Sequence, residues 1–145
     1  MSDNLLSMAR GDPSEFILLA ISLSLKETWG STANVALYRS GKELGKSLGI
    51  RFEKTLSLEE AVKELERILG NAWKGRLEGD KLVFDKCVLR DLYRRGGVEL
   101  DEPLPTCYFH IGFCAGVLER ILGRKVNLKA MSRGPLSCVE QIIME

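Results

Sequence analysis

TCYFHIGFCAGVLERILGRKVNLKAMSRGPLSC, residues 106–138, is the most informative part of this 145-residue chain. It holds three of the four cysteines and the only histidine. From Ile111 to Leu122 the apolar residues recur at steps of three and four, which predicts an α-helix. Thr106 is a candidate N-cap of this helix, and Gly123 can end it in a left-handed conformation.

Two glycines, Gly112 and Gly116, lie four residues apart and therefore share one face of the expected helix. Glycine destabilises a helix by about 1 kcal/mol relative to alanine. Two glycines on one face therefore indicate that another backbone or a ligand approaches this face closely. Gly41 and Gly45 repeat the same spacing in an earlier expected helix. We therefore expect the two helices to pack closely at these glycines.

Cys107, His110 and Cys114 also share a helix face, which raises the question of a metal site. Cys107 and Cys114 are seven residues apart, about 10.5 Å along the axis. Two sulfurs on one zinc ion are at most about 4.6 Å apart. Only neighbouring members of this trio can share an ion, and Cys138 and a further group would have to complete the site. We favour the alternative that the cysteines are buried hydrophobic side chains.

CYFHIGFCAG, then GRKVNLKA and GPLSC, resembles the C-terminal half of the 4-vinyl reductase domain family, whose members are also called hydrocarbon-binding proteins. The matching positions are Cys107, Gly112, Gly116, Gly123, Arg124, 126–130, Gly134 and Cys138. The family includes sensory domains of regulators that respond to aromatic pollutants, and it is distantly similar in fold to subunits of the TRAPP tethering complex. The resemblance implies an apolar ligand and, in the sensory domains, a bound zinc ion.

The sequence departs from the zinc-binding pattern that the resemblance implies. Where the sensory domains have a glutamate ligand, this chain has Ala130 or Asn127, and residues 131–133 supply no counterpart of their middle cysteine. Cys107 and Cys138 match the other two ligands. If a metal is present, we expect Cys107, His110 and Cys138 to hold it. Because a structural zinc requires four ligands, we expect no metal and no other cofactor.

Composition narrows the classes of protein that remain. Apolar residues make up 45% and charged residues 28% of the chain, as in an ordinary globular domain, and the net charge is +1. A nearly neutral chain gives no reason to expect a nucleic-acid partner. No run of eighteen apolar residues predicts a membrane span. The cysteines show neither a CxxC pair nor a dense disulfide pattern, so we expect a cytoplasmic protein with reduced thiols.

The order of expected elements predicts an α+β fold, with helices packed on one side of an antiparallel sheet made of two hairpins. Residues 1–11 are expected to be a flexible leader, and 12–145 a single domain. Helices are expected at 12–30, 31–48, 57–70 and 106–123, strands at 73–77, 81–87, 126–130 and 136–144, and a helical turn at 91–95. Ser31 is expected to cap the second helix, and Ser57 with Glu60 to form a capping box.

Two segments have two interpretations each. The first expected helix, 12–30, is apolar nearly all round, so it is either a central buried helix or part of a subunit interface. We expect a homodimer, because isologous pairing commonly hides such a surface. Residues 99–105 form either a lid over a pocket or a plain surface connection.

No phosphate loop, nucleotide fingerprint or nucleophile elbow is present, and His110 has no assignable orienting carboxylate, so we expect no enzyme. Our leading hypothesis is a binding module for a small hydrophobic molecule, a hydrocarbon or aromatic compound, in a sensory or carrier role. The candidate pocket residues are Tyr38, Gly41, Gly45, Trp73, Phe109, Gly112, Phe113 and Gly116. The alternative is a dimeric structural or assembly subunit without a ligand, similar in fold to TRAPP subunits.

Overall fold

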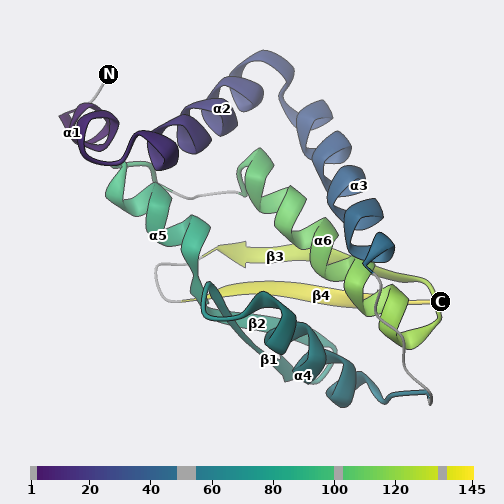
Figure 1. The fold of residues 1–145 in the computed structure, drawn as a ribbon. Helices are drawn as coiled ribbons and strands as arrows, with labels where there is room; N and C mark the ends of the chain where they lie inside the picture. Colours follow the sequence, from purple (N-terminus) through teal and green to yellow (C-terminus); the bar gives the residue numbers. More distant parts are fainter. Residues whose placement is uncertain (1–2, 49–54, 100–102, 134–136) are drawn as a thin grey trace.

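A computed structural model describes residues 3–48, 55–99, 103–133 and 137–145 of the chain. These residues form six helices and four strands (Figure 1): α1 Asp3–Gly11, α2 Pro13–Trp29, α3 Ser31–Ser47, α4 Leu58–Leu69, β1 Trp73–Glu78, β2 Lys81–Cys87, α5 Val88–Arg95, α6 Pro105–Leu122, β3 Val126–Arg133 and β4 Cys138–Met144. The α+β class expected from the sequence is confirmed.

The four strands form one antiparallel sheet in the order β1-β2-β4-β3. Each expected hairpin is present, and the two join through the pairing of β2 with β4, where Val83 lies opposite Val139. In the second hairpin Leu128 lies opposite Ile142. This order makes β3 an edge strand, so one of its sides has no strand beside it.

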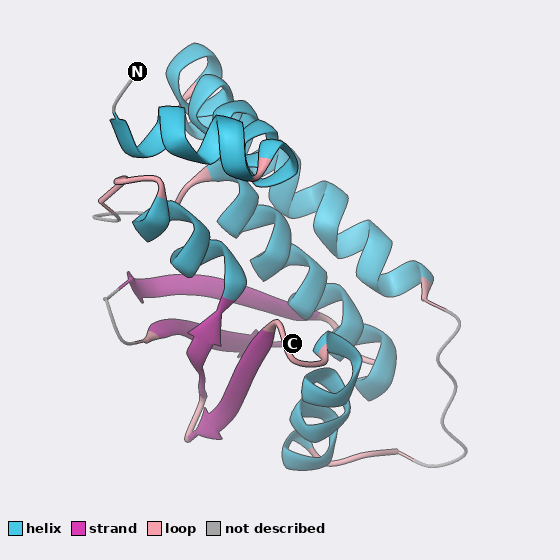
Figure 2. Cartoon of the chain, turned by 60° about the vertical axis from the view of Figure 1, so that its left-hand side comes forward, coloured by secondary structure: helices cyan, strands magenta, loops and turns pink. Residues whose placement is uncertain are grey.

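Helix α6 lies along one face of the sheet, and α3 packs on α6 from the outside (Figures 1 and 2). The main core fills the space between α4, α6 and the sheet, and its fully buried members include Leu65, Leu118 and Val126. A second cluster joins α1, α2, α5 and the start of α6 around Leu19 and Tyr93. The sequence of α6 therefore serves both cores.

Most helix ends follow the expected signals. Ser57 and Glu60 form the expected capping box of α4, and Gly123 ends α6 with φ 66° and ψ 23°, in the left-handed region. Two expected N-caps are wrong. Helix α6 begins at Pro105 after Leu104, because proline is suited to the first helical position, and α3 begins at Ser31 itself after Gly30.

The N-terminal segment differs from the flexible leader that we expected over residues 1–11. Asp3–Gly11 forms α1, and Met8 of this helix is buried in the second cluster beside Leu19. Burial of its few apolar residues explains why a short helix of weak propensity forms here. The expected lid at 99–105 lies in part outside the described residues, while Leu104 is buried and Pro105 is helical.

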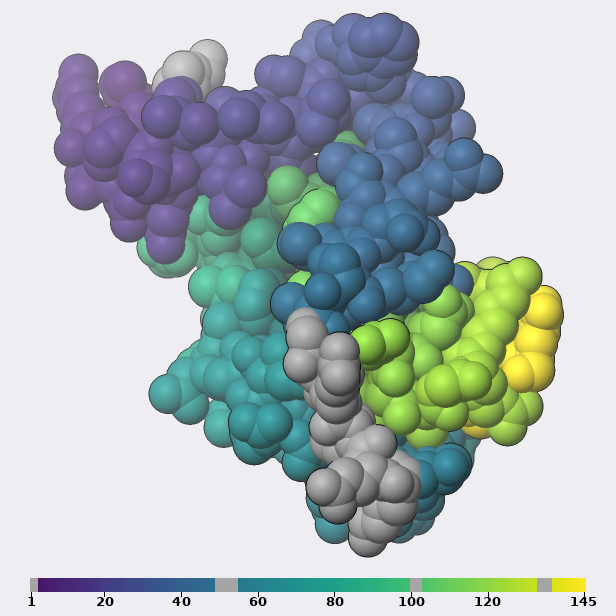
Figure 3. Space-filling view, turned by 45° about the vertical axis from the view of Figure 1, so that its right-hand side comes forward, coloured from purple at the N-terminus to yellow at the C-terminus, as the bar shows by residue number. Residues whose placement is uncertain are grey.

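Helix α2 is not the central buried helix that its composition allowed. Leu19 and Ser22 are its buried residues, whereas Ile17, Ile21 and Trp29 are 55%, 52% and 62% exposed. The space-filling view shows α1 and α2, in purple, projecting beyond the rest of the molecule (Figure 3). The subunit-interface interpretation of α2 therefore remains. Within the described part of the chain, no helix has the length and apolar character needed to cross a membrane.

Candidate functional site

The four glycines of the expected helix pair meet in one seam between α3 and α6. A Cβ atom added to Gly112 would lie 2.8 Å from the carbonyl carbon of Tyr38, and one added to Gly41 would lie 2.9 Å from the amide nitrogen of Phe113. Gly45 and Gly116 are equally close to the opposite backbone. Real Cβ atoms essentially never come within 3.0 Å of such neighbours. The predicted close packing at these glycines is confirmed.

This seam leaves no room for a ligand at the glycines themselves. Of the eight residues expected to line a pocket, the main surface groove includes Tyr38, whereas Phe113 packs against the main core. Trp73 stacks on His110, with ring centroids 4.2 Å apart and planes 9° from parallel. Phe109 contributes its carbonyl group to the contact with Gly41. The candidates therefore do not line one common pocket.

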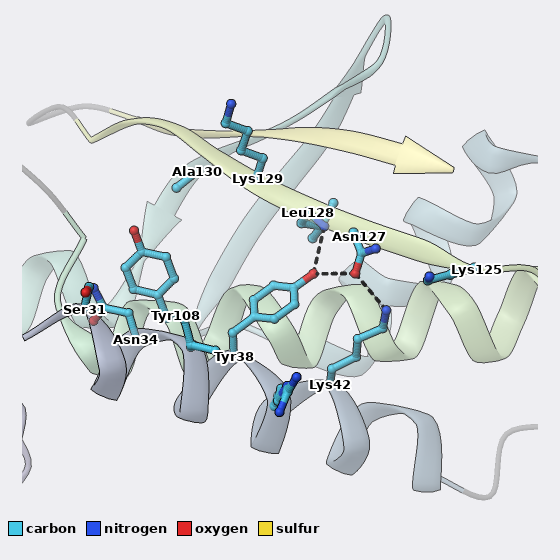
Figure 4. Close-up of a pocket in the computed structure, with 12 residues that line it drawn as sticks. Ser31, Asn34, Tyr38, Lys42, Tyr108, Lys125, Asn127, Leu128, Lys129 and Ala130 are labelled. Atoms are coloured by element: carbon cyan, nitrogen blue, oxygen red, sulfur yellow. Dashed lines mark hydrogen bonds between the residues drawn. The ribbon is translucent and has the colours of Figure 1, made fainter. Parts of the chain in front are cut away.

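The main groove runs between α3, the first turn of α6 and the outer edge of β3, and it has a volume of about 770 Å³. In Figure 4, Tyr38 reaches from α3 to β3, and Tyr108 projects from α6 at one end of the groove. The lining residues are Ser31, Asn34, Val35, Tyr38, Arg39, Lys42, Tyr108, Lys125, Asn127, Leu128, Lys129 and Ala130. The groove thus combines aromatic and aliphatic walls with basic side chains.

The hydroxyl group of Tyr38 ties α3 to β3 in this groove. It accepts a hydrogen bond of 3.0 Å from the Leu128 amide and donates one of 3.2 Å to Oδ1 of Asn127 (Figure 4). Lys42 also donates to Oδ1 of Asn127, at 2.8 Å. Burial raises the pKa of Tyr38 above its usual value, and the hydrogen bond from Leu128 only partly opposes this. The tyrosine is therefore neutral over the physiological range.

Glu119 of α6 holds the other end of the same interface. It accepts a hydrogen bond of 3.0 Å from the Val126 amide and pairs with Lys42 at 3.2 Å and Lys46 at 3.4 Å. Burial alone would raise the pKa of Glu119, but these hydrogen bonds and cations outweigh it and lower the pKa. Glu119 is therefore charged at neutral pH and fixes α3, α6 and β3 together.

A second, closed site lies beneath the start of α6. Cys107, His110 and Cys138, which we expected to be the ligands of any metal, line one small cavity together with Cys87 and Arg90. Its volume of about 10 Å³ has room for about one water molecule. All four cysteines of the chain are buried thiols. The sequence pattern indicated the first three residues but not Cys87, Arg90 or Glu140, which come from β2, α5 and β4.

Cys87 is the N-cap residue of α5, and its side chain makes no capping hydrogen bond. A hydrogen bond with the Cys138 side chain lowers the pKa of Cys87 to about 7, against the opposing effect of burial, and the nearby amides of Arg90 and Leu89 lower it further. A thiolate at a helix N-terminus is favoured in this way. Cys87 is thus substantially ionised at neutral pH.

The cavity does not fit the zinc ion that the family resemblance implies. Arg90 is 5% exposed, and its guanidinium donates to the carbonyls of Phe84 and Asp85 at 3.4 and 2.7 Å and to the sulfur of Cys138 at 3.7 Å. The fixed positive charge at the thiols opposes the binding of a dication, although the buried carboxylate of Glu140, which also lines the cavity, acts in the opposite direction. Among the described residues, no three His, Cys, Asp or Glu side chains are grouped so as to hold a metal ion.

His110 makes its thiol contact with Cys114, whose sulfur lies 3.6 Å from Nε2. Burial raises the pKa of Cys114 well above its usual value, so this thiol is protonated. The imidazole is held between Trp73 and Phe84, with the Phe84 ring meeting it edge-on at 5.3 Å. A protonated thiol beside a packed imidazole lacks the activated sulfur that thiol catalysis requires.

A third feature is the exposed face of α2. Its apolar side chains border a shallow hollow of about 340 Å³, lined by Phe16, Ile17, Ala20, Ile21, Ser24, Leu25, Thr28 and Trp29. Contiguous exposed apolar patches on a protein surface often mark sites of interaction with a partner. The sequence identified this helix as apolar, and the structure shows which of its residues are exposed.

No protein-family model matches the chain, and no curated protein matches it. Among solved structures, the chain is similar to a protein from Methanocaldococcus jannaschii described as a vinyl-4-reductase family protein. The two share 21% sequence identity with a TM-score of 0.53, and the similarity covers 89% of this chain and 77% of that one. The chain therefore has a 4-vinyl reductase domain fold, as its resemblance to that family led us to expect.

Proposed function

We propose that the protein is a non-catalytic binding module for a small, largely apolar molecule, in a sensory or carrier role, with the groove between α3, α6 and β3 as its binding site. The observation that carries this proposal is the groove itself. Its volume of about 770 Å³ falls in the range of small-molecule sites. Tyr38, Tyr108, Val35 and Leu128 give it apolar walls with polar groups at their edges.

The fold is consistent with this role. The resemblance of residues 106–138 to hydrocarbon-binding proteins implies an apolar ligand, and the similarity to the archaeal structure concerns the fold. Against catalysis, the Cys114 thiol beside His110 is kept protonated by burial, and the cavity that holds Cys87 has room for about one water molecule. We propose a cytoplasmic location because reducing conditions keep such buried thiols intact.

A matched pair of exposed valines tests the groove. Val35 lies in it and is 59% exposed, whereas Val88 of α5 is 37% exposed and lies outside it. We expect calorimetry to show binding of the neutral probe 2-naphthylmethanol to the wild type and to Val88→Glu. We expect Val35→Glu to weaken it about tenfold, because a carboxylate in the groove must be desolvated. Equal binding by both variants, or no binding to the wild type, would refute the proposal.

The second candidate function is assembly as a homodimer through α2, with or without a ligand. It is favoured by the exposed Ile17, Ile21 and Trp29, which lie on one helix around a hollow. A second copy of the same surface is the simplest partner for an apolar helix face, because most soluble oligomers are isologous dimers. The groove and the α2 surface lie on different elements, so the two candidates are compatible.

A further inference from the structure

Among the residues that the structure describes, the groove is lined by several cations and by no carboxylate. Arg39, Lys42, Lys125 and Lys129 all belong to it. Two of these cations form ion pairs with carboxylates: Lys42 pairs with Glu119 at 3.2 Å, and Lys125 pairs with Glu145 at 3.6 Å. Arg39 and Lys129 form no ion pair with any other residue that the structure describes. Within the described part of the chain, the groove therefore carries two positive charges without an ion-pair partner beside its aromatic wall.

The outer edge of β3 is closed to an added strand at Val126 and Leu128. The Val126 amide donates to Glu119 and the Leu128 amide donates to Tyr38, so both edge amides are already bound by helix side chains. An extended peptide pairing with β3 would have to displace both contacts. This protection of an edge strand argues against a peptide as the occupant and favours a small molecule.

One further amide on this edge faces the open end of the groove. Residues of an antiparallel strand alternate between amides that point to the partner strand and amides that point away. The Leu128 amide points away from β4, toward Tyr38, and regular alternation would direct the Ala130 amide the same way, just before the register irregularity between Ala130 and Ser132. Ala130 lines the groove together with Tyr108. This end of the groove thus offers a hydrogen-bond donor to a ligand.

We propose that the groove selects organic anions, namely monocarboxylates with an aromatic or short aliphatic body. The positive charges of Arg39 and Lys129 attract the carboxylate to the groove, and the apolar body lies against Tyr38, Tyr108 and Val35. Arginine and lysine side chains and a main-chain amide are the donors that carboxylates prefer. This inference rests on the proposed function, because it names the ligand class of the same groove. It adds charge selection to a site otherwise expected to take neutral apolar molecules.

Two matched probes separate the inference from the function on which it rests. 2-Naphthoate and 2-naphthylmethanol share one ring system and differ in charge. We expect calorimetry at about 20 mM salt to show naphthoate binding about tenfold more tightly, the combined effect of two exposed positive charges. At about 0.5 M salt the preference should fall below about threefold, because exposed charges are screened.

The double variant Arg39→Gln/Lys129→Gln should remove the preference for naphthoate over the alcohol. The control Lys63→Gln/Lys81→Gln removes the same charge from α4 and β2, outside the groove, and should keep the preference. If the alcohol binds and naphthoate binds no more tightly, the inference is wrong and the proposed function stands. A preference lost equally in the control would also overturn it. If neither probe binds the wild type, the proposed function fails and the inference fails with it.

Discussion

The hydroxyl group of Tyr38 accepts a hydrogen bond of 3.0 Å from the main-chain amide of Leu128, ninety residues later in the chain. This single contact joins α3 to the edge strand of the sheet and forms one wall of the groove (Figure 4). The same tyrosine contributes its carbonyl group to the seam opposite Gly112. Tyr38 therefore takes part both in the packing of the two helices and in the wall of the groove.

Removing that hydroxyl should measurably destabilise the fold. Tyr38→Phe leaves the partly buried Leu128 amide without its partner, which should cost about 1–2 kcal/mol of unfolding free energy. Tyr108→Phe is the matched control, because the Tyr108 hydroxyl makes no hydrogen bond to the described residues and its loss should cost under about 0.5 kcal/mol. Urea denaturation of both variants measures the difference. Equal effects would mean that the Tyr38 contact contributes nothing.

Substitutions in the glycine seam should be far more costly. Gly112→Ala and Gly116→Ala each place a Cβ against the backbone of α3, and overpacking of this kind typically costs about 1–3 kcal/mol. Gly112→Leu and Gly116→Leu should cost more than the alanine variants. Gly11→Ala at the end of α1 meets nothing within 4 Å and should be neutral. Thermal melts of the seam variants within a degree or two of the wild type would contradict the close packing.

The exposed face of α2 should mediate self-association. Sedimentation equilibrium at micromolar concentration should give a dimer for the wild type, and Ile21→Glu should give a folded monomer because a charge enters the apolar surface. Ile143→Glu is the control, since Ile143 is 44% exposed and lies on β4. A monomeric wild type would rule out the dimer.

The thiol cavity predicts a pH dependence of stability that Cys87 controls. Its pKa is about 7 in the folded chain against an ordinary value of 9.0, so the folded state favours the thiolate. The resulting stabilisation is complete above the unfolded pKa and is lost as the pH falls from 9 toward 7. Relative to Cys87→Ser, the wild type should gain up to about 2–3 kcal/mol across this window.

Urea denaturation at pH 7, 8 and 9 measures that gain, and thiolate absorbance at 240 nm should titrate with a midpoint near 7 in the folded protein only. Cys114 provides the contrast, because burial raises its pKa and it should remain protonated in the folded chain throughout. Parallel pH profiles for the wild type and Cys87→Ser would show that the Cys87 thiol is not ionised.

The cavity should also fold without stoichiometric zinc. Arg90 places a permanent positive charge beside Cys138, where a metal would need electron-rich ligands. Elemental analysis of protein purified without chelator should find well under one zinc per chain. One zinc per chain, lost together with the fold in Cys138→Ser, would show that a ligand set compensates for the missing glutamate and cysteine.

The helix seam was predictable because its signal is local and periodic. Gly41 with Gly45 and Gly112 with Gly116 each mark one helix face, and the capping box at Ser57 and the stop at Gly123 fix helix ends in the same way. Leader residues 1–11 lack such a pattern, so α1 was missed. Its helix depends on the burial of Met8 against residues distant in sequence.

The groove was not predictable from the same sequence. Its residues come from α3, α6 and β3, and their juxtaposition depends on β3 lying at the edge of the sheet, which no local pattern reveals. The eight expected pocket residues were chosen for glycine spacing and aromaticity, and that choice identified the seam together with Tyr38. Arg90 was missed because a single arginine in a short amphipathic helix normally faces solvent.

The most direct test of the account is to map where a small apolar molecule binds. Titration of ¹⁵N-labelled protein with 2-naphthylmethanol should shift the amide resonances of Val35, Tyr108, Leu128 and Ala130, which come from three elements and meet only at the groove. Resonances of α2 should stay unchanged. Shifts confined to α2 between Ile17 and Trp29, or no saturable shifts at all, would contradict the assignment of the groove as the binding site.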